Sequence, residues 1–215
     1  MEDFQADHVV IATGARWTCD GIGRKNPRGI MTAEDARVLT PDDVMAGQRP
    51  DGPVTIFEGD HFYIGDLVAE VLRKDGQDVT LVIPSAYVSE WSHQTLEQHC
   101  IQARLMAMGV KLCLTHNLYK IMADRITVVC GYSGAHTSIP TECVVLVTMR
   151  TPVDDLYQTL AAKKLMSLAR IGDCLGPSTI AVAIYGDHRY ARELGGSGVG
   201  NVPFRREIPG LCAVD

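Results

Sequence analysis

The chain has 215 residues, of which 46% are apolar, and 26 acidic side chains outnumber 20 basic ones. This length and composition suffice for one large domain or two small ones with a buried core. The mildly acidic balance, without a basic block, argues against nucleic acid as a partner. No run approaches the roughly 18 apolar residues needed to cross a bilayer, and the acidic N-terminus is unlike a signal peptide. We therefore expect a soluble, cytoplasmic protein with no membrane partner.

The cysteines and histidines predict neither a disulfide framework nor a metal centre. The seven cysteines are odd in number and scattered in spacing, and no Cys-x-x-Cys motif occurs, which argues against zinc and against an iron–sulfur cluster within this chain. The seven histidines are equally dispersed. His93 and His99 lie six residues apart, a spacing that does not place them on one helix face as metal ligands.

The first predicted element is a β-rich apolar run over residues 8–12 that ends in Thr13 and Gly14. A fully buried strand needs neighbours on both sides, and no residues upstream supply one. Residues 17–31 are rich in Gly, Pro and Arg, which is typical of an irregular loop. The sequence Thr-Pro-Asp-Asp over 40–43 predicts the start of a short helix.

From residue 52 the pattern changes to alternating strands and helices. A strand, a helix and a second strand are predicted over 53–57, 64–74 and 78–83, a βαβ pattern that calls for parallel strands and a right-handed crossover. A further helix, a strand, a β-meander and a buried strand are predicted over about 95–108, 110–114, 118–139 and 143–148. We interpret residues 52–150 as a unit inserted between two segments of another sheet.

The stretch Leu168–Ile180 predicts an apolar strand, a tight turn with Gly172 and Asp173, and a helix with Pro177 in its first turn. Apolar residues recur at helical spacing through Leu194. The helix N-terminus favours phosphate, and the Asp173 carboxylate can accept a hydrogen bond from a ribose or ribityl hydroxyl. In the alternative interpretation, the glycine only makes the turn and the aspartate only caps the helix. Considered without the rest of the chain, the stretch favours this alternative over a nucleotide site.

Two strand ends together resemble a known group of enzymes. The strands that close in Ile11-Ala-Thr-Gly14 and in Ile171-Gly-Asp173 resemble the ATG and GD motifs of flavoproteins with two dinucleotide-binding domains. Between these motifs such enzymes insert a nucleotide-binding βαβ domain with a β-meander. Nearly the whole chain is similar to the C-terminal part of the trimethylamine dehydrogenase, dimethylamine dehydrogenase and 2,4-dienoyl-CoA reductase group. The segments that carry this narrower resemblance are Ile11–Trp17 with Asp20-Gly21, Leu39–Pro41, Gly172–Ser178 and His188–Glu193.

The resemblance implies an α/β, Rossmann-like fold with two dinucleotide-binding domains. Residues 1–51 and 151–215 would form a partial FAD- or ADP-binding domain. Residues 52–150 would form an inserted NAD(P)-binding-like domain, with a parallel-sheet βαβ unit and a β-meander.

By the same resemblance, the cofactor-binding residues are Thr13, Gly14, Gly172 and Asp173. Thr13 and Gly14 would face ADP or FAD, and Asp173 would hydrogen-bond a cofactor hydroxyl. The family's barrel with FMN, its iron–sulfur cysteine cluster and its Gly-rich phosphate loop have no counterpart in the 215 residues. We therefore expect a truncated product or one polypeptide of a split enzyme. FMN and the cluster would belong to the missing part, and nucleotide binding here would be weak at best.

The inserted unit carries a broken form of the family's glycine fingerprint. Asp60 and Phe62 align with its first two glycines, and only Gly65 remains. A phenylalanine blocks the approach of the backbone to a pyrophosphate, and an aspartate adds negative charge beside it. Ile83 replaces the acidic residue expected on the ribose. We therefore expect a retained fold without an NAD(P) site, which favours the amine dehydrogenase branch because that branch needs no NAD(P)H.

Three functions follow as hypotheses. The first is an oxidoreductase fragment, the nucleotide-binding region of a flavin-dependent, trimethylamine dehydrogenase-like enzyme that supports structure and electron transfer without catalysis. The second is a stand-alone adenine-nucleotide-binding or interaction module, and the third is the pyridine-nucleotide domain of a 2,4-dienoyl-CoA reductase-like enzyme. Expected partners are a separate barrel-containing chain or an electron-transfer flavoprotein, in a homo- or hetero-oligomer. We expect no catalytic and no metal-binding residue, and Cys174 has the one arguable case for a reactive thiol.

Overall fold

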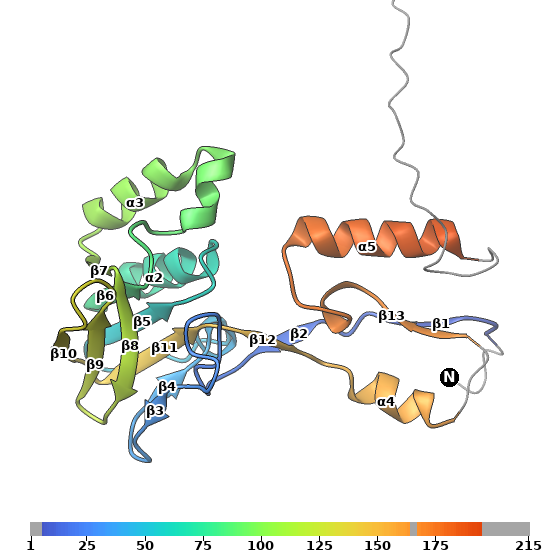
Figure 1. Ribbon diagram of the computed structural model, residues 1–215, viewed down its shortest axis with the longest axis horizontal. Helices are drawn as coiled ribbons and strands as arrows, with labels where there is room; N and C mark the ends of the chain where they lie inside the picture. The colour runs from blue at the N-terminus through green and yellow to red at the C-terminus, as the bar shows by residue number, and fades with distance from the viewer. Residues whose placement is uncertain (1–5, 164–166, 195–215) are drawn as a thin grey trace, which may run out of the picture. The chain divides into compact units, whose positions relative to one another are not determined.

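The computed structural model describes residues 6–163 and 167–194 and divides the chain into two compact units (Figure 1). The larger unit is Arg16–Thr151, and the smaller one combines Met1–Ala15 with Pro152–Asp215. The chain passes between the units in β2 (Ala15–Trp17) and β12 (Arg150–Pro152), which pair with each other. The larger unit therefore includes residues 16–51 in addition to the residues 52–150 that were interpreted as an inserted domain, and that domain division stays a prediction.

A five-stranded parallel sheet organises the larger unit. Its strand order is β4-β11-β5-β6-β7, and all of its strand pairs are parallel. The bounds are Val38–Leu39 for β4, Val54–Glu58 for β5, Val79–Ile83 for β6, Lys111–Leu114 for β7 and Cys143–Val147 for β11. The βαβ unit predicted from the sequence is confirmed, since β5 and β6 flank α2 (Ile64–Lys74) and pair in parallel.

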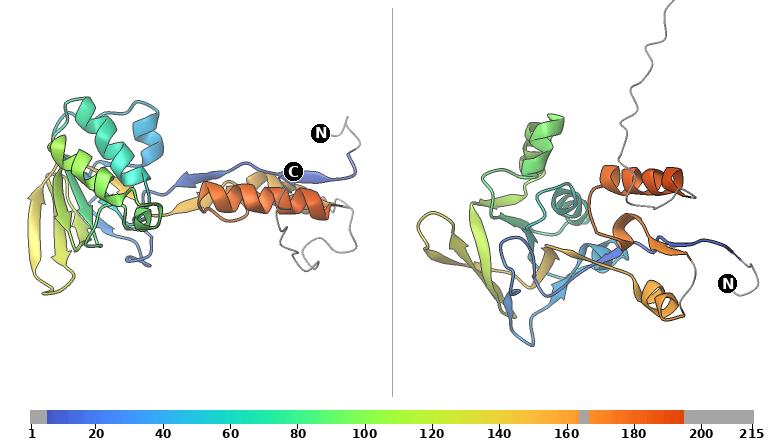
Figure 2. Two further views of the ribbon diagram at one scale, coloured as in Figure 1. Left: turned by 90° about the horizontal axis from the view of Figure 1, so that it is seen from above. Right: turned by 45° about the vertical axis from the view of Figure 1, so that its right-hand side comes forward.

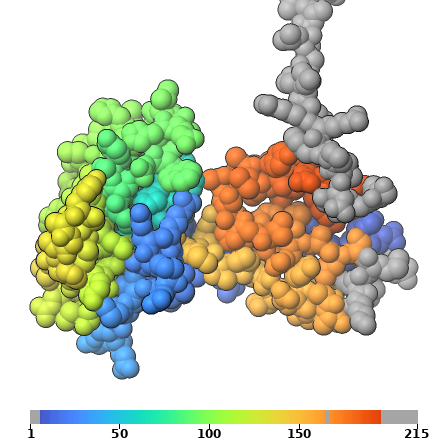
Figure 3. All heavy atoms as spheres, in the orientation of Figure 1, coloured from blue at the N-terminus to red at the C-terminus, as the bar shows by residue number. Residues whose placement is uncertain are grey.

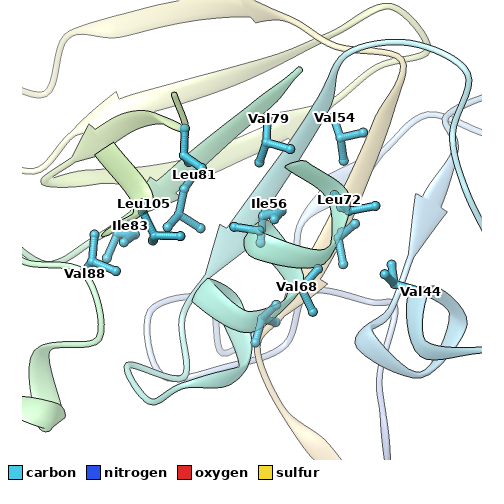
Figure 4. Packing of buried hydrophobic residues seen from close by; sticks show 14 of the residues in the cluster. Val44, Val54, Ile56, Val68, Leu72, Val79, Leu81, Ile83, Val88 and Leu105 are labelled. Carbon is cyan, nitrogen blue, oxygen red and sulfur yellow. The ribbon is translucent and has the colours of Figure 1, made fainter. Parts of the chain in front are cut away.

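Alternate residues of these strands face two different layers, as the period of a β-strand requires. On one face, Ile56 and Leu81 pack in a cluster with Val68 and Leu72 of α2 (Figure 4). The same cluster includes residues from α1 (Pro41–Met45) and α3 (Gln98–Ala107), and Figure 2 shows these helices grouped together. On the other face, Phe57 packs in a second cluster with residues of the β-meander.

The β-meander forms a second sheet with the order β10-β9-β8-β3. Its strands are β8 (His116–Ile121), β9 (Arg125–Cys130) and β10 (His136–Pro140), which pair antiparallel as expected. β3 (Met31–Thr32) pairs with β8, and β4 pairs with β11. These two pairings explain why residues 16–51 belong to the larger unit.

Local sequence explains where two helices of the larger unit begin. Thr40 and Asp43 form the predicted capping box, in which each side chain accepts a hydrogen bond from the backbone N–H of the other residue. The helix expected from about residue 95 begins only at Gln98. It is preceded by a 3₁₀ helix, η2 (Glu90–Thr95), and by Leu96, whose φ of 63° interrupts the helical conformation.

The smaller unit contains a two-stranded parallel sheet, β1 (Val9–Ile11) with β13 (Leu168–Arg170). Three further elements belong to it: α4 (Asp155–Ala161), η3 (Gly172–Cys174) and α5 (Ile180–Glu193). Among the described residues of this unit, the buried core is small and consists of Ile11, Leu160 and Cys174. β1 therefore differs from the expected fully buried strand, because only its last residue is buried.

The final helix also differs from the prediction. α5 begins at Ile180, after an extended Thr179, so Pro177 precedes the helix and is not in its first turn. No residue of α5 is buried in the described chain, and Ile180 and Ile184 are 79% and 60% exposed. The apolar spacing predicted the helix correctly, but nothing among the described residues covers its apolar side.

Two further findings concern the described residues alone. None of their helices is long and apolar enough to span a bilayer, and the cytoplasmic location stays a prediction. Within the same ranges, no group of three or more His, Cys, Asp and Glu side chains is placed to hold a metal ion. The described cysteines are all free thiols.

Candidate functional site

The structure brings the four predicted cofactor-binding residues to one edge of the smaller unit. β1 and β13 pair in parallel with Ile11 opposite Arg170, and the Ile171 N–H donates to the Ile11 carbonyl at 3.0 Å. Because the strands are parallel, their carboxyl ends meet, so Thr13-Gly14 and Gly172-Asp173 emerge side by side. In open α/β sheets, ligands bind in this position outside the carboxyl ends of the strands.

Thr13 and Gly14 contribute differently to this edge. The Thr13 hydroxyl donates to the Val153 carbonyl and lies 3.2 Å from the Cys174 Sγ, so it holds neighbouring segments of the unit together. Gly14 has a φ of 77°, and a β-carbon built there would contact nothing within 4 Å. The backbone at Gly14 is therefore open to a ligand, while the Thr13 hydroxyl is engaged inside the protein.

The GD turn joins β13 to the segment before α5. Gly172 has a φ of 57°, a conformation that favours glycine. Asp173 accepts a hydrogen bond from the Ser178 N–H at 3.1 Å. The sequence left open whether Asp173 binds a cofactor or only caps the following helix. The hydrogen bond to Ser178 is of the capping kind, but it stabilises the turn before the helix and not the helix itself. Cys174 is fully buried, and its thiol lies 3.4 Å from the Val153 carbonyl, which leaves it inaccessible to a redox partner.

A second carboxylate, Asp187 of α5, lies at the same turn and was not found by sequence reasoning. One of its oxygens is buried without a hydrogen-bond partner. That oxygen lies 3.5 Å from the position of a β-carbon built at Gly172. A buried acceptor without a donor is costly. The only sequence signal was an acidic residue within the otherwise apolar part of the helix.

The corresponding edge of the larger unit is occupied by its own side chains. Glu58 ends β5, and its carboxylate accepts hydrogen bonds from the backbone N–H groups of Asp60 and His61. Phe62 stacks on Trp91 with ring centroids 5.4 Å apart, and the Arg24 guanidinium lies 5.0 Å from the Trp91 ring centroid. In dinucleotide-binding domains the N–H groups of this loop contact the pyrophosphate.

Burial shifts the titration of four groups around this loop toward their neutral forms. It raises the pKa of Glu58 to about 8 and the pKa of Asp66 to about 6. It also raises the pKa of Asp60 and lowers the pKa of His61. Asp60 of this cluster was singled out in the sequence as a fingerprint position, whereas Glu58, His61 and Asp66 were not.

Comparisons with known proteins give a consistent result. No protein-family profile matches the chain. Dimethylamine dehydrogenase from Hyphomicrobium sp. (strain x) is 29% identical over 219 residues, which cover 89% of this chain and 30% of that protein. Histamine dehydrogenase from Rhizobium sp. 4-9 has a TM-score of 0.89 at 39% identity, over 95% of this chain and 33% of the other.

Two further solved structures extend this result. The 6-hydroxypseudooxynicotine amine oxidase from Pseudomonas geniculata N1 has a TM-score of 0.87 at 34% identity, over 90% of this chain and 30% of that one. A flavoprotein disulfide reductase from Escherichia coli matches at 15% identity with a TM-score of 0.61, a likeness of fold alone. These matches confirm the expected α/β, Rossmann-like dinucleotide-binding fold. The chain spans about a third of the length of the amine-oxidising proteins it matches.

Proposed function

Because the chain is homologous to the C-terminal nucleotide-binding region of the trimethylamine dehydrogenase family, we propose that it is part of a flavin-dependent amine dehydrogenase. In this role it supports structure and electron transfer and does not carry out catalysis. The observation that carries the proposal is the similarity of 89–95% of the chain to two enzymes named for the dehydrogenation of amines. FMN and an iron–sulfur cluster would belong to the remainder of such an enzyme.

The proposed cofactor at the smaller unit is ADP or FAD. The open backbone at Gly14 and the Asp173 carboxylate fit an adenine nucleotide better than a phosphate alone, because carboxylates accept from hydroxyl groups and repel phosphate oxygens. Asp173 would therefore hold a ribose or ribityl hydroxyl at the ends of β1 and β13. We expect weak binding of ADP or FAD, since the carboxylate would contact only the sugar part of the ligand.

For the larger unit, we propose a scaffold that does not use NAD(P)H. Glu58 occupies backbone N–H groups of the loop that would contact a pyrophosphate, and Phe62 fills its second glycine position. Calorimetry with NADH is therefore expected to show no saturable heat. Binding in the micromolar range would contradict this proposal and favour the reductase-like alternative.

We further propose that another polypeptide covers α5 and β1. Ile180, Val182 and Ile184 are each more than half exposed, and β1 has a strand neighbour on one side only in the described chain. Parallel strands are generally buried on both faces. The partner proposed is the barrel-containing chain, which would carry the rest of the enzyme. Light scattering is expected to show an oligomer or complex that an Ile180→Ser/Ile184→Ser variant weakens.

The main experiment measures binding of ADP and FAD to the purified full chain by calorimetry. Asp173→Asn keeps an oxygen that can accept from the Ser178 N–H but loses the charge, so affinity should fall by roughly 10-fold or more. Asp20→Asn is a matched control, because Asp20 also accepts a backbone N–H, from Ile22 at 2.9 Å, in the other unit. Equal losses in both variants, or no binding of either nucleotide, would contradict the assigned site.

A further inference from the structure

Glu58 and His61 form a buried pair of side chains, and each has one polar atom without a hydrogen-bond partner. Glu58 is 1% exposed and His61 is 5% exposed. The Glu58 Oε1 accepts the His61 backbone N–H. The other carboxyl oxygen, Oε2, and the His61 ring nitrogen Nδ1 are both buried without a hydrogen-bond partner. These two atoms lie 3.9 Å apart, so an approach of about 1 Å brings them to hydrogen-bond distance.

The protonation states of the two side chains decide whether they can satisfy each other. When the ring proton of His61 is on Nε2, Nδ1 is an acceptor, so an ionised Glu58 carboxylate would place two buried acceptors opposite each other. A protonated Oε2 is a donor and matches an Nδ1 lone pair when the ring proton is on Nε2. We propose that Glu58 donates such a proton to His61 at neutral pH, that this single proton holds the Gly59–Tyr63 loop closed, and that its loss at alkaline pH releases the loop.

The charges around the pair favour this neutral arrangement. Burial is the largest cause that raises the pKa of Glu58 to about 8; the backbone hydrogen bond from His61 opposes it, and the neighbouring carboxylates Asp60 and Asp66 raise the pKa further. The pKa of His61 is lowered, first by burial. Ionisation of Glu58 would thus place a buried negative charge beside two carboxylates, of which Asp66 is buried and Asp60 is half-buried. The charged groups that face His61 and Asp60 from the surrounding segments are Glu90 of η2, Arg24 and Lys25 of the loop after β2, and Arg150 of β12.

The loop held by this pair is strained and carries a reporter. His61 has a φ of 67°, in the left-handed region that residues other than glycine adopt uncommonly. The His61 carbonyl accepts a hydrogen bond from the Trp91 backbone N–H at 3.2 Å, and the Trp91 ring stacks on Phe62 of the loop. Release of the loop therefore separates Phe62 from Trp91 and changes the surroundings of the indole. This device does not depend on the proposed enzymatic role.

The test follows Trp91 fluorescence of the full chain as the pH rises from 6 to 9.5. A Trp17→Phe background leaves Trp91 as the only tryptophan, since the sequence contains two. We expect one reversible transition with a midpoint near the Glu58 pKa of about 8. Glu58→Gln should abolish it, because the amide supplies a permanent N–H donor toward Nδ1. Glu34→Gln, which removes an exposed carboxylate, should retain the transition.

A second variant tests the partner of the proton. His61→Gly suits the positive φ but removes the Nδ1 acceptor, so the neutral form of Glu58 loses a hydrogen bond. The midpoint should then fall by about one pH unit. A transition that persists in Glu58→Gln, or a midpoint unmoved in His61→Gly, would overturn the proposal.

Nuclear magnetic resonance of the unsubstituted chain, labelled with ¹⁵N-histidine, covers the case in which Glu58→Gln does not fold. The His61 Nδ1 resonance should report a hydrogen-bonded acceptor at pH 7 and change with a midpoint near 8. A His61 resonance that does not change in this range would equally contradict the shared proton.

Discussion

Gly65 and Glu58 pack so closely that a β-carbon built at Gly65 would lie 2.1 Å from the Glu58 Cγ. Gly65 was identified in the sequence as the one surviving glycine of a nucleotide-binding fingerprint. In the structure its missing side chain makes room for a glutamate of the same chain. A glycine typical of cofactor binding therefore serves internal packing, at the end of the strand where a pyrophosphate would otherwise bind.

Gly65→Ala is expected to destabilise the larger unit. The contact is with the carbons nearest the backbone of Glu58, which cannot move away as a flexible side-chain end could. Overpacking of this kind costs about 1–3 kcal/mol in the free energy of unfolding, measured by urea denaturation. A Glu58→Ala/Gly65→Ala double variant should lose less than the sum of the single losses, because the clash is gone.

Gly186→Ala provides the matched control in a second helix. A β-carbon at Gly186 would contact nothing within 4 Å, and Gly186 lies inside α5 without a positive φ. Alanine should therefore raise stability by about 0.4–1 kcal/mol, since it restricts the unfolded chain and favours helix. Loss of stability at both positions would show that the clash at Gly65 is not the cause.

Asp66→Asn is expected to change the pH dependence of stability. Asp66 is 2% exposed, and burial raises its pKa to about 6 from 3.8. A raised folded pKa gives stability that is present below pH 3.8 and is lost as the pH rises through about 6. The asparagine still accepts from the Ser89 hydroxyl, 2.9 Å away in the unsubstituted protein. The variant should be more stable at pH 8 by about 1–3 kcal/mol and similar below pH 4.

Ser89→Ala tests the same carboxylate from the other side. The Ser89 hydrogen bond lowers the pKa of Asp66 and so opposes the effect of burial. Its removal should extend the loss of stability to higher pH, as measured by urea denaturation between pH 5 and 8. A variant that loses stability equally at all these pH values would contradict the assignment of this titration to Asp66.

Cys130 is expected to be the most readily alkylated of the thiols in the meander and its neighbouring strands. Hydrogen bonds from the Ser133 side chain and from backbone N–H groups lower the pKa of Cys130 to about 7, whereas burial raises the pKa of Cys113 and of Cys143. Cys130 lies at the end of the β9–β10 hairpin, which is yellow in Figure 3. Thiolate is the reactive form, so iodoacetamide should label Cys130 first at pH 7.

Peptide mass spectrometry resolves the labelling of each cysteine. Ser133→Ala should slow the labelling of Cys130 at pH 7 by up to about 5-fold, because a rise of one unit from a pKa of about 7 lowers the thiolate fraction from about one half to about one tenth. Ser138→Ala, in the exposed strand β10, removes a hydroxyl from the same hairpin and should have no effect. Equal rates in the two variants would contradict the role of the Ser133 hydroxyl.

Gly14→Ala is expected to weaken nucleotide binding by about 10-fold or more, as calorimetry with ADP would measure. Its β-carbon would project into the open space where the proposed ligand approaches the backbone. Gly134→Ala is a matched control, since Gly134 has a φ of 69° and equally open surroundings in a hairpin turn of the other unit. Both variants carry similar backbone strain, so equal affinities would place the ligand elsewhere.

Much of the fold was predicted from sequence because its signals are local. Local patterns predict several elements directly, because hydrophobic periodicity and capping residues act over a few positions. These elements are the apolar strands around Ile56 and Leu81, the helix between them and the turns of the meander. The same holds for the capping box at Thr40. The strand ends at Gly14 and Asp173 were predicted to lie together, and the parallel pairing of β1 with β13 places both at one edge.

The tertiary structure decided what these local signals could not. Residues 16–51 belong to the larger unit because β3 and β4 pair with strands about a hundred residues away. The buried Asp187 oxygen, the packing of Glu58 on Gly65, and the proximity of Glu58 to His61 depend on how a loop turns between two elements. The sequence thus determined which segments become strands and helices, since hydrophobic periodicity acts over a few residues. Burial and charge at each site were decided only when distant segments excluded water from them.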